Sequence, residues 1–302
     1  MKILLYLCRK LNHIRMKKLL TLLLIPLFVG CTADKSLTGE DLLRMLNEQQ
    51  LSLVVYNNDS LSTYTRHRVD NLMQLVTNEP ERLRGALVAD KRIGNAAATL
   101  IALGGVSEVH TNYVTRQARQ ILDQAGVKLV YQSEGDMILN RDGTKQCPMD
   151  ASLNGITDPK KGYEVLTRQG WALLDILNAN SHSLVVLRDD EMQTYNDRGV
   201  QDLVLLVTNE PERLNDAIVA DKMVGKAAAS LMVAGGVREV YTNLICRSAL
   251  EVFRKAGIAV HAKQVVEQIL NRDRSGQCPI DALLNETDDV EQCVEILQGR
   301  FN

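Results

Sequence analysis

The chain contains the same segment twice, and this repeat limits the folds that it can adopt. The stretch from Leu75 to Leu83 reads LVTNEPERL and recurs from Leu206 to Leu214, so the spacing is 131 residues (206 − 75). The motifs VADK, ILNRD and QCP recur at the same spacing, and about half of the matched positions are identical. A unit of this length is a domain and not a solenoid element. The sequence therefore predicts two copies of one domain, at residues 39–169 and 170–302.

The hydrophobic pattern of each copy predicts an α/β domain with a mixed sheet. Apolar residues recur at helical spacing in some segments, while others are short apolar runs bounded by turn residues. In the first copy we expect strands at 53–56, 61–65, 86–89, 108–111 and 127–131, and helices at 69–78, 95–103, 115–125 and from 148. The first two strands form a hairpin around Asn57 to Asp59. Alternation of the later strands with helices predicts mainly parallel pairing, with helices flanking the sheet.

The N-terminus predicts export and lipid attachment. Basic residues follow Met16, and Leu19 to Gly30 is an apolar run that is short for a membrane span. Cys31 follows Gly30, which resembles the lipobox of bacterial lipoproteins. The sequence predicts a signal peptide at 1–30, a tether at 31–38 and a membrane partner through lipidated Cys31, in the bacterial cell envelope. An ordinary signal peptide or an N-terminal membrane helix is the alternative, and translation starts at Met1 or Met16.

The composition argues against nucleic acid and against a metal. The formal net charge is −2 and aromatic residues make up 4% of the chain, whereas nucleic-acid binding favours basic surfaces and stacking rings. Four cysteines follow the predicted lipidation site, and their disulfide state stays open: Cys147, Cys246, Cys278 and Cys293. None forms a C-x-x-C pair, so we expect no zinc site and no cofactor.

Two motifs shared by the copies carry a resemblance to a known family. Ala89 to Ala98 reads A-D-K-x-x-G-x-A-A-A, and Ile138 to Pro148 reads I-L-N-R-D-x-x-x-x-C-P. With the order of elements, they make each copy similar to domain of unknown function 1893. The resemblance implies a three-layer fold like that of cytidine deaminases, but it brings no established activity.

The residues that zinc deamination requires are missing from both copies. Cytidine deaminases place His or Cys with a Glu at the start of one helix and P-C-x-x-C at the start of the next. Here the first of these helices opens with Gly94-Asn95 or Gly225-Lys226. Cys246 falls near a ligand position of the next helix, but Ala249 stands where its partner would be. We therefore expect no zinc-dependent deamination.

Polar residues follow the predicted parallel strands in both copies. Because the carboxyl ends of parallel strands meet at one edge of a sheet, ligands bind there. The predicted ligand-binding residues are Thr111, Asn112, Arg116, Asn140, Arg141 and Asp142, with Thr242, Asn243, Arg247, Asn271, Arg272 and Asp273 in the second copy. The alternative is that these residues are helix caps, turn formers and internal ion pairs, shared because the copies have a common origin.

Cys147 and Cys278 are the sharpest candidates for chemistry. Each precedes a proline at a predicted helix start, where the helix dipole lowers the pKa of a thiol. The candidate catalytic residues are Cys147, Asp90 and Lys91, with Cys278, Asp221 and Lys222 in the second copy. The alternative is a small buried thiol. No histidine recurs between the copies, so a shared Cys-His pair is excluded.

Three functions remain open from the sequence. The first is a membrane-tethered module that binds a small polar ligand. The second is an enzyme that uses Cys147 and Cys278 as nucleophiles with Asp90 and Asp221. The third is a structural or interaction module in which the two domains pack together and the pockets are vestigial.

Overall fold

The computed structural model describes residues 37–66, 69–140 and 142–301. The predicted signal peptide, Cys31 and Arg141 lie outside the described residues. Residues 37–302 belong to one compact unit. Within the described part of the chain, no helix combines the length and the apolar composition needed to cross a membrane.

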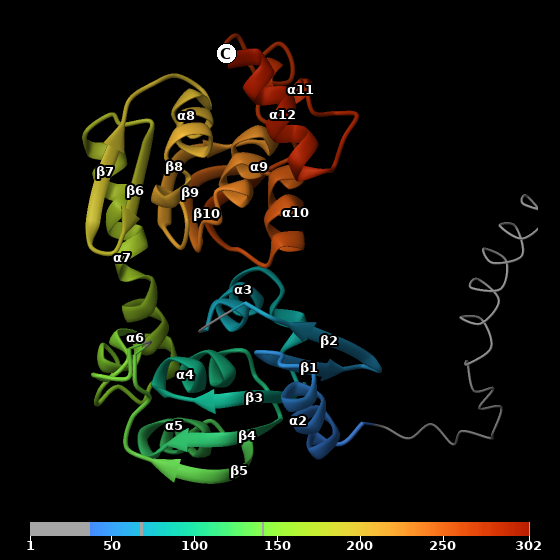
Figure 1. Cartoon of the computed structure of the whole chain (residues 1–302), viewed down its shortest axis with the longest axis vertical. Helices are drawn as coiled ribbons and strands as arrows, with labels where there is room; N and C mark the ends of the chain where they lie inside the picture. Colours follow the sequence, from blue (N-terminus) through green and yellow to red (C-terminus); the bar gives the residue numbers. More distant parts are fainter. Residues whose placement is uncertain (1–36, 67–68, 141, 302) are drawn as a thin grey trace, which may run out of the picture. The chain divides into compact units, whose positions relative to one another are not determined.

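The first repeat is a mixed sheet flanked by helices (Figure 1). Its sheet has the order β2-β1-β3-β4-β5, in which β1 is antiparallel to β2 and β3, and β3, β4 and β5 are parallel. The strands are β1 (Leu53–Asn57), β2 (Ser60–Tyr64), β3 (Leu87–Ile93), β4 (Glu108–Thr115) and β5 (Lys128–Gly135). The helices are α2 (Gly39–Glu48), α3 (Asp70–Asn78), η1 (Pro80–Arg82), α4 (Asn95–Leu103), α5 (Arg116–Gln124) and α6 (Pro148–Ala151).

The second repeat has the same elements in the same order. Its sheet runs β7-β6-β8-β9-β10, again with an antiparallel hairpin beside parallel strands. Its strands are β6 (Leu184–Arg188), β7 (Glu191–Tyr195), β8 (Ile218–Val224), β9 (Glu239–Cys246) and β10 (Ala259–Val266). Its helices are α8 (Gln201–Asn209), η2 (Pro211–Arg213), α9 (Lys226–Ala234), α10 (Arg247–Ala256), α11 (Pro279–Ala282) and α12 (Val290–Phe301). The predicted tandem α/β domains with mixed sheets are thus confirmed.

One continuous helix, α7 (Pro159–Ala179), connects the repeats. Its first part corresponds to α12 at the spacing of 131, and residues 170–179 correspond to α2. The last helix of one repeat is therefore also the first helix of the next. The predicted boundary at 169/170 lies inside α7, where these two halves meet.

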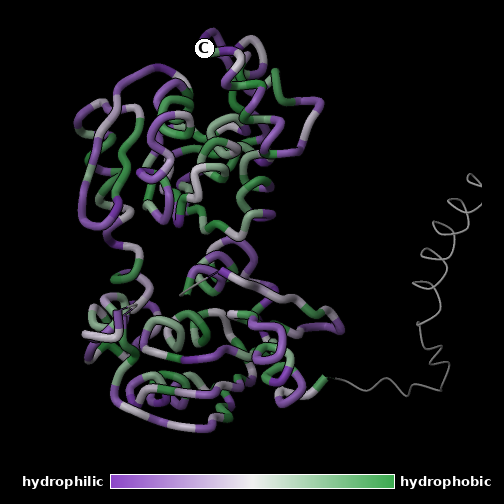
Figure 2. The backbone as a smooth tube through the Cα atoms, viewed as in Figure 1, coloured by the Kyte–Doolittle hydropathy of each residue, from purple (hydrophilic) through white to green (hydrophobic). Residues whose placement is uncertain are grey.

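Each sheet is covered on both faces. Leu42 and Leu46 of α2 pack on Val54 and Ala89, and the second half of α7 covers the same face in the second repeat. Helices α3, α4 and α5 bury the opposite face, where residues such as Val88 lie in the main core. Figure 2 shows hydrophobic stretches along the strands and helices of both repeats. The burial of both faces explains why β3 begins as an apolar run and does not alternate.

The parallel strands are longer than predicted, and this corrects the expected place of several site residues. Asp90 and Lys91 lie inside β3, and Thr111 and Asn112 lie inside β4. The Asp90 carboxylate accepts from the Arg92 amide at 3.1 Å, and Thr111 Oγ1 accepts from the Tyr113 amide at 3.3 Å. Strand pairing then continues to residues 93 and 114. The prediction ended each strand near its first polar residues, but these side chains are satisfied by the backbone of their own strand.

The two repeats contact each other through different surfaces. Asn78 of α3 donates to the Val260 carbonyl at 2.9 Å and accepts from the Val260 amide at 3.0 Å. Arg66 donates to the carbonyls of Val237 and Ala256, both at 3.3 Å. Ala259 of β10 belongs to the main core of the first repeat. The contact is therefore head to tail, with α3 of the first repeat on the edge strand of the second.

Candidate functional site

The structure brings one predicted pair together in each sheet. Asp90 lies beside Thr111, and Asp221 beside Thr242, as direct neighbours on paired strands. Burial raises the pKa of Asp90 to about 7 and that of Asp221 to about 7. A carboxyl group with such a pKa exchanges a proton near neutral pH, which is a property of many functional sites. Both also accept a backbone amide two residues on, which is the structural role that the alternative expects.

The starts of α4 and α5 are joined by a hydrogen bond between buried side chains. Thr115 Oγ1 donates to Asn95 Oδ1 at 3.2 Å, and both side chains are buried. In the second repeat Lys226 stands in place of Asn95, and its ammonium donates to the carbonyls of Leu284 at 3.0 Å and Thr287 at 2.6 Å. Within the described ranges, no group of three or more His, Cys, Asp or Glu side chains is arranged to hold a metal ion.

The Asp that follows each Cys-Pro pair by two residues, Asp150 or Asp281, holds the start of α4 or α9. Asp150 accepts the amide of Ala96 at 2.8 Å, and Asp281 accepts that of Ala227 at 3.0 Å. The N-cap residue of α4 is Gly94, which has no side chain to cap the helix. Asp150 therefore supplies the capping oxygen from a distant part of the chain. Sequence reasoning placed Asp150 only in the first turn of its own helix and missed this contact.

Cys147 and Cys278 lie directly before α6 and α11, as predicted. Both thiols are half-buried and unpaired. Helix α6 has only four residues, so its dipole is much weaker than that of a long helix. Among the described side chains, no hydrogen bond or ion pair joins Cys147 to Asp90 or Lys91, and their joint catalytic role stays a prediction.

The remaining predicted ligand-binding residues mostly have structural partners. Asn112 exchanges amide hydrogen bonds with Asn47 of α2, and Asn243 does the same with Asn178. The Asn140 side chain accepts hydrogen bonds from two backbone amides of its own turn. In the second repeat, Asn271 and Asp273 each accept one from a backbone amide of the equivalent turn. Arg116 pairs with Asp136 and Arg247 with Glu267, all exposed. Lys91 and Lys222 are half-buried on their strands, whereas Asp142 and Arg272 are exposed.

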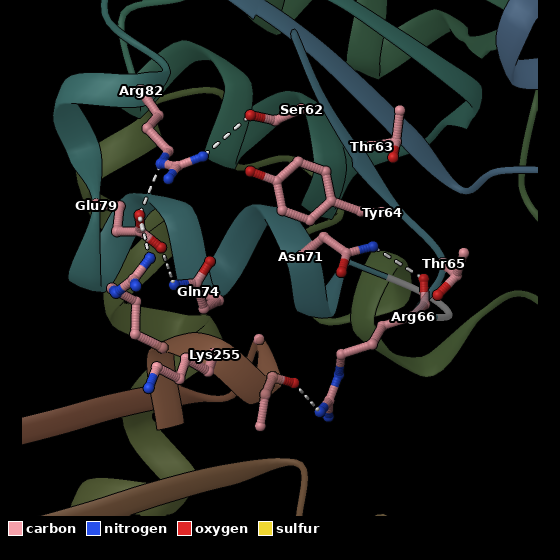
Figure 3. A pocket seen from close by; sticks show the side chains of 13 residues that line it. Ser62, Thr63, Tyr64, Thr65, Arg66, Asn71, Gln74, Glu79, Arg82 and Lys255 are labelled. Carbon is pink, nitrogen blue, oxygen red and sulfur yellow. Dashed lines mark hydrogen bonds and ion pairs between the residues drawn. The ribbon is translucent and has the colours of Figure 1, made fainter. Parts of the chain in front are cut away.

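A polar groove lies where the repeats meet, and the sequence did not predict it (Figure 3). It encloses about 480 Å³ between β2, α3 and the end of α10. Its charged lining side chains are Arg66, Arg82, Arg254, Lys255 and Glu79, so four cations face one carboxylate. Neutral polar groups include Ser62, Thr63, Tyr64, Asn71 and Gln74.

Glu79 organises the groove. Its carboxylate lies 2.6 Å from Arg82 Nε and 3.6 Å from Arg254 Nη1, and it accepts from Gln74 Nε2 at 2.8 Å. Glu79 and Gln74 are almost fully buried. Burial raises the pKa of the Tyr64 phenol, which keeps it a neutral donor. Glu79 thus orients Arg82, whereas Arg254 is held mainly by Glu251, to which it donates from Nη2 at 2.6 Å and from Nε at 2.7 Å.

The groove is not evident from the sequence, because several of its residues stand where the two repeats differ. Arg66 corresponds to Asp197, and Gln74 corresponds to Leu205. Its cations also come from segments about 170–190 residues apart, which the head-to-tail contact alone brings together. Positions at which the two copies differ are therefore the sequence feature that points to this groove.

These features define a protein of two tandem α/β domains, with mixed five-stranded sheets and a polar groove between them. The chain belongs to the family described as domain of unknown function DUF1893 (TM1506), whose model matches residues 41–169 and 172–301. A solved DUF1893 family protein from Thermotoga maritima is 26% identical, covering 43% of this chain and 88% of that chain, with a TM-score of 0.40. No curated protein matches the chain.

Proposed function

We propose that this protein is an exported lipoprotein that binds a small anionic molecule in the groove between its repeats. The observation that carries the proposal is the charge of the groove, where four cationic side chains face the single carboxylate of Glu79. Cys31 anchors the protein to a membrane of the bacterial cell envelope. The volume of about 480 Å³ lies within the range of small-molecule sites.

The groups in the groove suit a carboxylate or a phosphate. Arg82 is held by Glu79 and donates to Ser62 Oγ at 3.0 Å, so its guanidinium is already oriented. Lys255 is half exposed and lies 4.0 Å from Asp288, which leaves its ammonium able to reach an anion. The hydroxyl groups of Ser62 and Tyr64 add hydrogen bonds that a polar ligand requires.

The proposal includes a cytidine-deaminase-like fold that does not use zinc. In both repeats, the helix that would carry a zinc ligand in a deaminase begins with a residue whose side chain is hydrogen-bonded within the protein. The Asn95 side chain accepts a hydrogen bond from Thr115, and the Lys226 ammonium donates to the Leu284 carbonyl after α11. Ligand binding is therefore assigned to the groove and not to these helix starts.

Titration calorimetry with inorganic phosphate and with citrate tests the groove. We expect binding that weakens with salt and that weakens about tenfold in Lys255→Gln, a change of about 1.4 kcal/mol. Arg84→Gln is the matched control, because Arg84 is exposed and does not line the groove. The proposal is wrong if neither anion binds, or if both variants bind like the parent protein.

A further inference from the structure

The contact between the repeats joins two different surfaces, and each surface is present twice in the chain. One surface is the face of α3 that carries Asn78, and the other is β10, the edge strand of the second sheet. By the repeat spacing, α8 carries a second copy of the α3 face, and β5 is a second copy of the β10 edge. A head-to-tail contact uses one copy of each surface and leaves the other copy free.

The copy on α8 is exposed to solvent. Asn209 stands at the position of Asn78 and is exposed. Leu205 stands at the position of Gln74, and 47% of its surface is exposed. The two are four residues apart, so they lie on one face of the helix. In the described residues, no hydrogen bond of the Asn209 side chain is present, unlike the two that Asn78 makes.

The copy on β5 is an unpaired strand edge. β5 lies at the end of its sheet and pairs only with β4. Val130 is 38% exposed and Tyr131 is 42% exposed. An edge strand with exposed apolar side chains is a template for another protein surface. In the second repeat, the equivalent edge is covered by α3, and Ala259 and Val260 are buried.

The free surfaces also differ from the bound ones in a complementary way. Arg66 beside the α3 face corresponds to Asp197 beside α8, and Ala259 of β10 corresponds to Lys128 of β5. The α8 side thus gains an acid, and the β5 side gains Lys128, whose ammonium donates to Glu108 at 3.0 Å while 68% of its side chain stays exposed. Opposite charges on the two partners of a contact favour their encounter and their register.

We propose that the α8 face of one chain, with Leu205 and Asn209, binds the β5 edge of a second copy of this chain, residues 129–131. Asn209 then pairs with the backbone of Leu129 as Asn78 pairs with that of Val260. Each added chain presents a further free surface, so the association extends beyond dimers.

Disulfide crosslinking of the full chain in membranes tests this contact. Asn209→Cys combined with Leu129→Cys is expected to give dimers, trimers and larger species on oxidation. All variants carry Ser in place of Cys147, Cys246, Cys278 and Cys293, so each single variant can crosslink only to its own copy and stops at dimers. The matched control is Asn78→Cys with Val260→Cys, which closes within one chain and keeps the mass of a monomer.

A third substitution tests whether the series of dimers, trimers and larger species arises from the proposed contact. Leu205→Arg places a charge in the proposed contact, and it should abolish the trimers and larger species of the Asn209→Cys and Leu129→Cys variant. It should leave the control crosslink between positions 78 and 260 intact, which shows that the fold persists. The proposal is overturned if no trimer forms while the control disulfide between positions 78 and 260 forms. It is also overturned if Leu205→Arg leaves the trimers and larger species unchanged.

Discussion

The carboxylate of Asp150 occupies the space that a side chain at Gly94 would need. A Cβ atom added to Gly94 would lie 2.0 Å from Asp150 Oδ2, and one added to Gly225 would lie 2.1 Å from Asp281 Oδ2. The same carboxylates cap α4 and α9. The φ of Gly94 is −98°, which any residue can adopt. Glycine is therefore required at this position by the nearby carboxylate of Asp150 and not by the backbone conformation.

This relationship predicts a strong coupling between positions 94 and 150. Gly94→Ala should destabilise the fold by about 1–3 kcal/mol through overpacking. Asp150→Ala should cost about 1–3 kcal/mol, because the buried amide of Ala96 loses its partner. The double variant should cost less than the sum, since the shorter side chain makes room for the new methyl group. Urea unfolding measures all three, and strictly additive costs would contradict the contact.

Asn78 should matter for stability while its copy Asn209 should not. Asn78→Ala leaves both backbone groups of Val260 without their partner, which should cost about 1–3 kcal/mol. Asn209→Ala removes an exposed side chain and should change the stability of the monomer by less than about 0.5 kcal/mol. Thermal unfolding of dilute protein compares the two. Equal effects would mean that Asn78 does not hold the repeats together.

Asp90 and Asp221 should make the protein less stable as the pH rises from about 4 to about 7. Asp90 and Asp221 have a pKa of about 7 in the fold, against 3.8 for the ordinary group. Between these values the folded chain binds more protons than the unfolded chain, so its stability is complete at the acid end and is lost toward pH 7.

Asn is the matched replacement for the protonated carboxyl group. Asp90→Asn should reduce the slope of unfolding free energy against pH by up to about 1.4 kcal/mol per pH unit, and Asp221→Asn should act likewise. Urea unfolding at several pH values gives the slope. A slope that both variants leave unchanged would show that these carboxyl groups are already ionised in the fold.

Cys31 should decide where the protein resides. Cys31→Ser removes the thiol that we propose carries the lipid, so membrane fractions should lose the protein or accumulate its unprocessed form. Labelled palmitate should enter the parent protein and not the variant. Cys147→Ser is the control, because Cys147 lies far along the chain from the proposed lipidation site. Mass spectrometry that finds an unmodified mature N-terminus upstream of residue 31 would refute lipidation.

The predicted site was only partly recoverable from the sequence. The rule that parallel strands end at one edge places Asp90 beside Thr111, and the structure has them as neighbours. The rule does not say how far each strand continues, because a side chain that binds its own backbone keeps a polar residue inside a strand. The role of Asp150 depends on a contact 54 residues away (150 − 96), which local pattern does not encode.

The sequence by itself determined the duplication, the α/β class and the order of the elements, because hydrophobic period and turn residues act over short distances. Only the tertiary structure decided which surfaces of the two repeats meet. Asn78 and Asn209 are the same residue in the same motif, yet one is bonded to Val260 and the other is exposed. The physical reason is that the contact joins two unlike surfaces, so the α3 face of the first repeat meets the β10 edge of the second, and the α8 face and the β5 edge lie outside that contact.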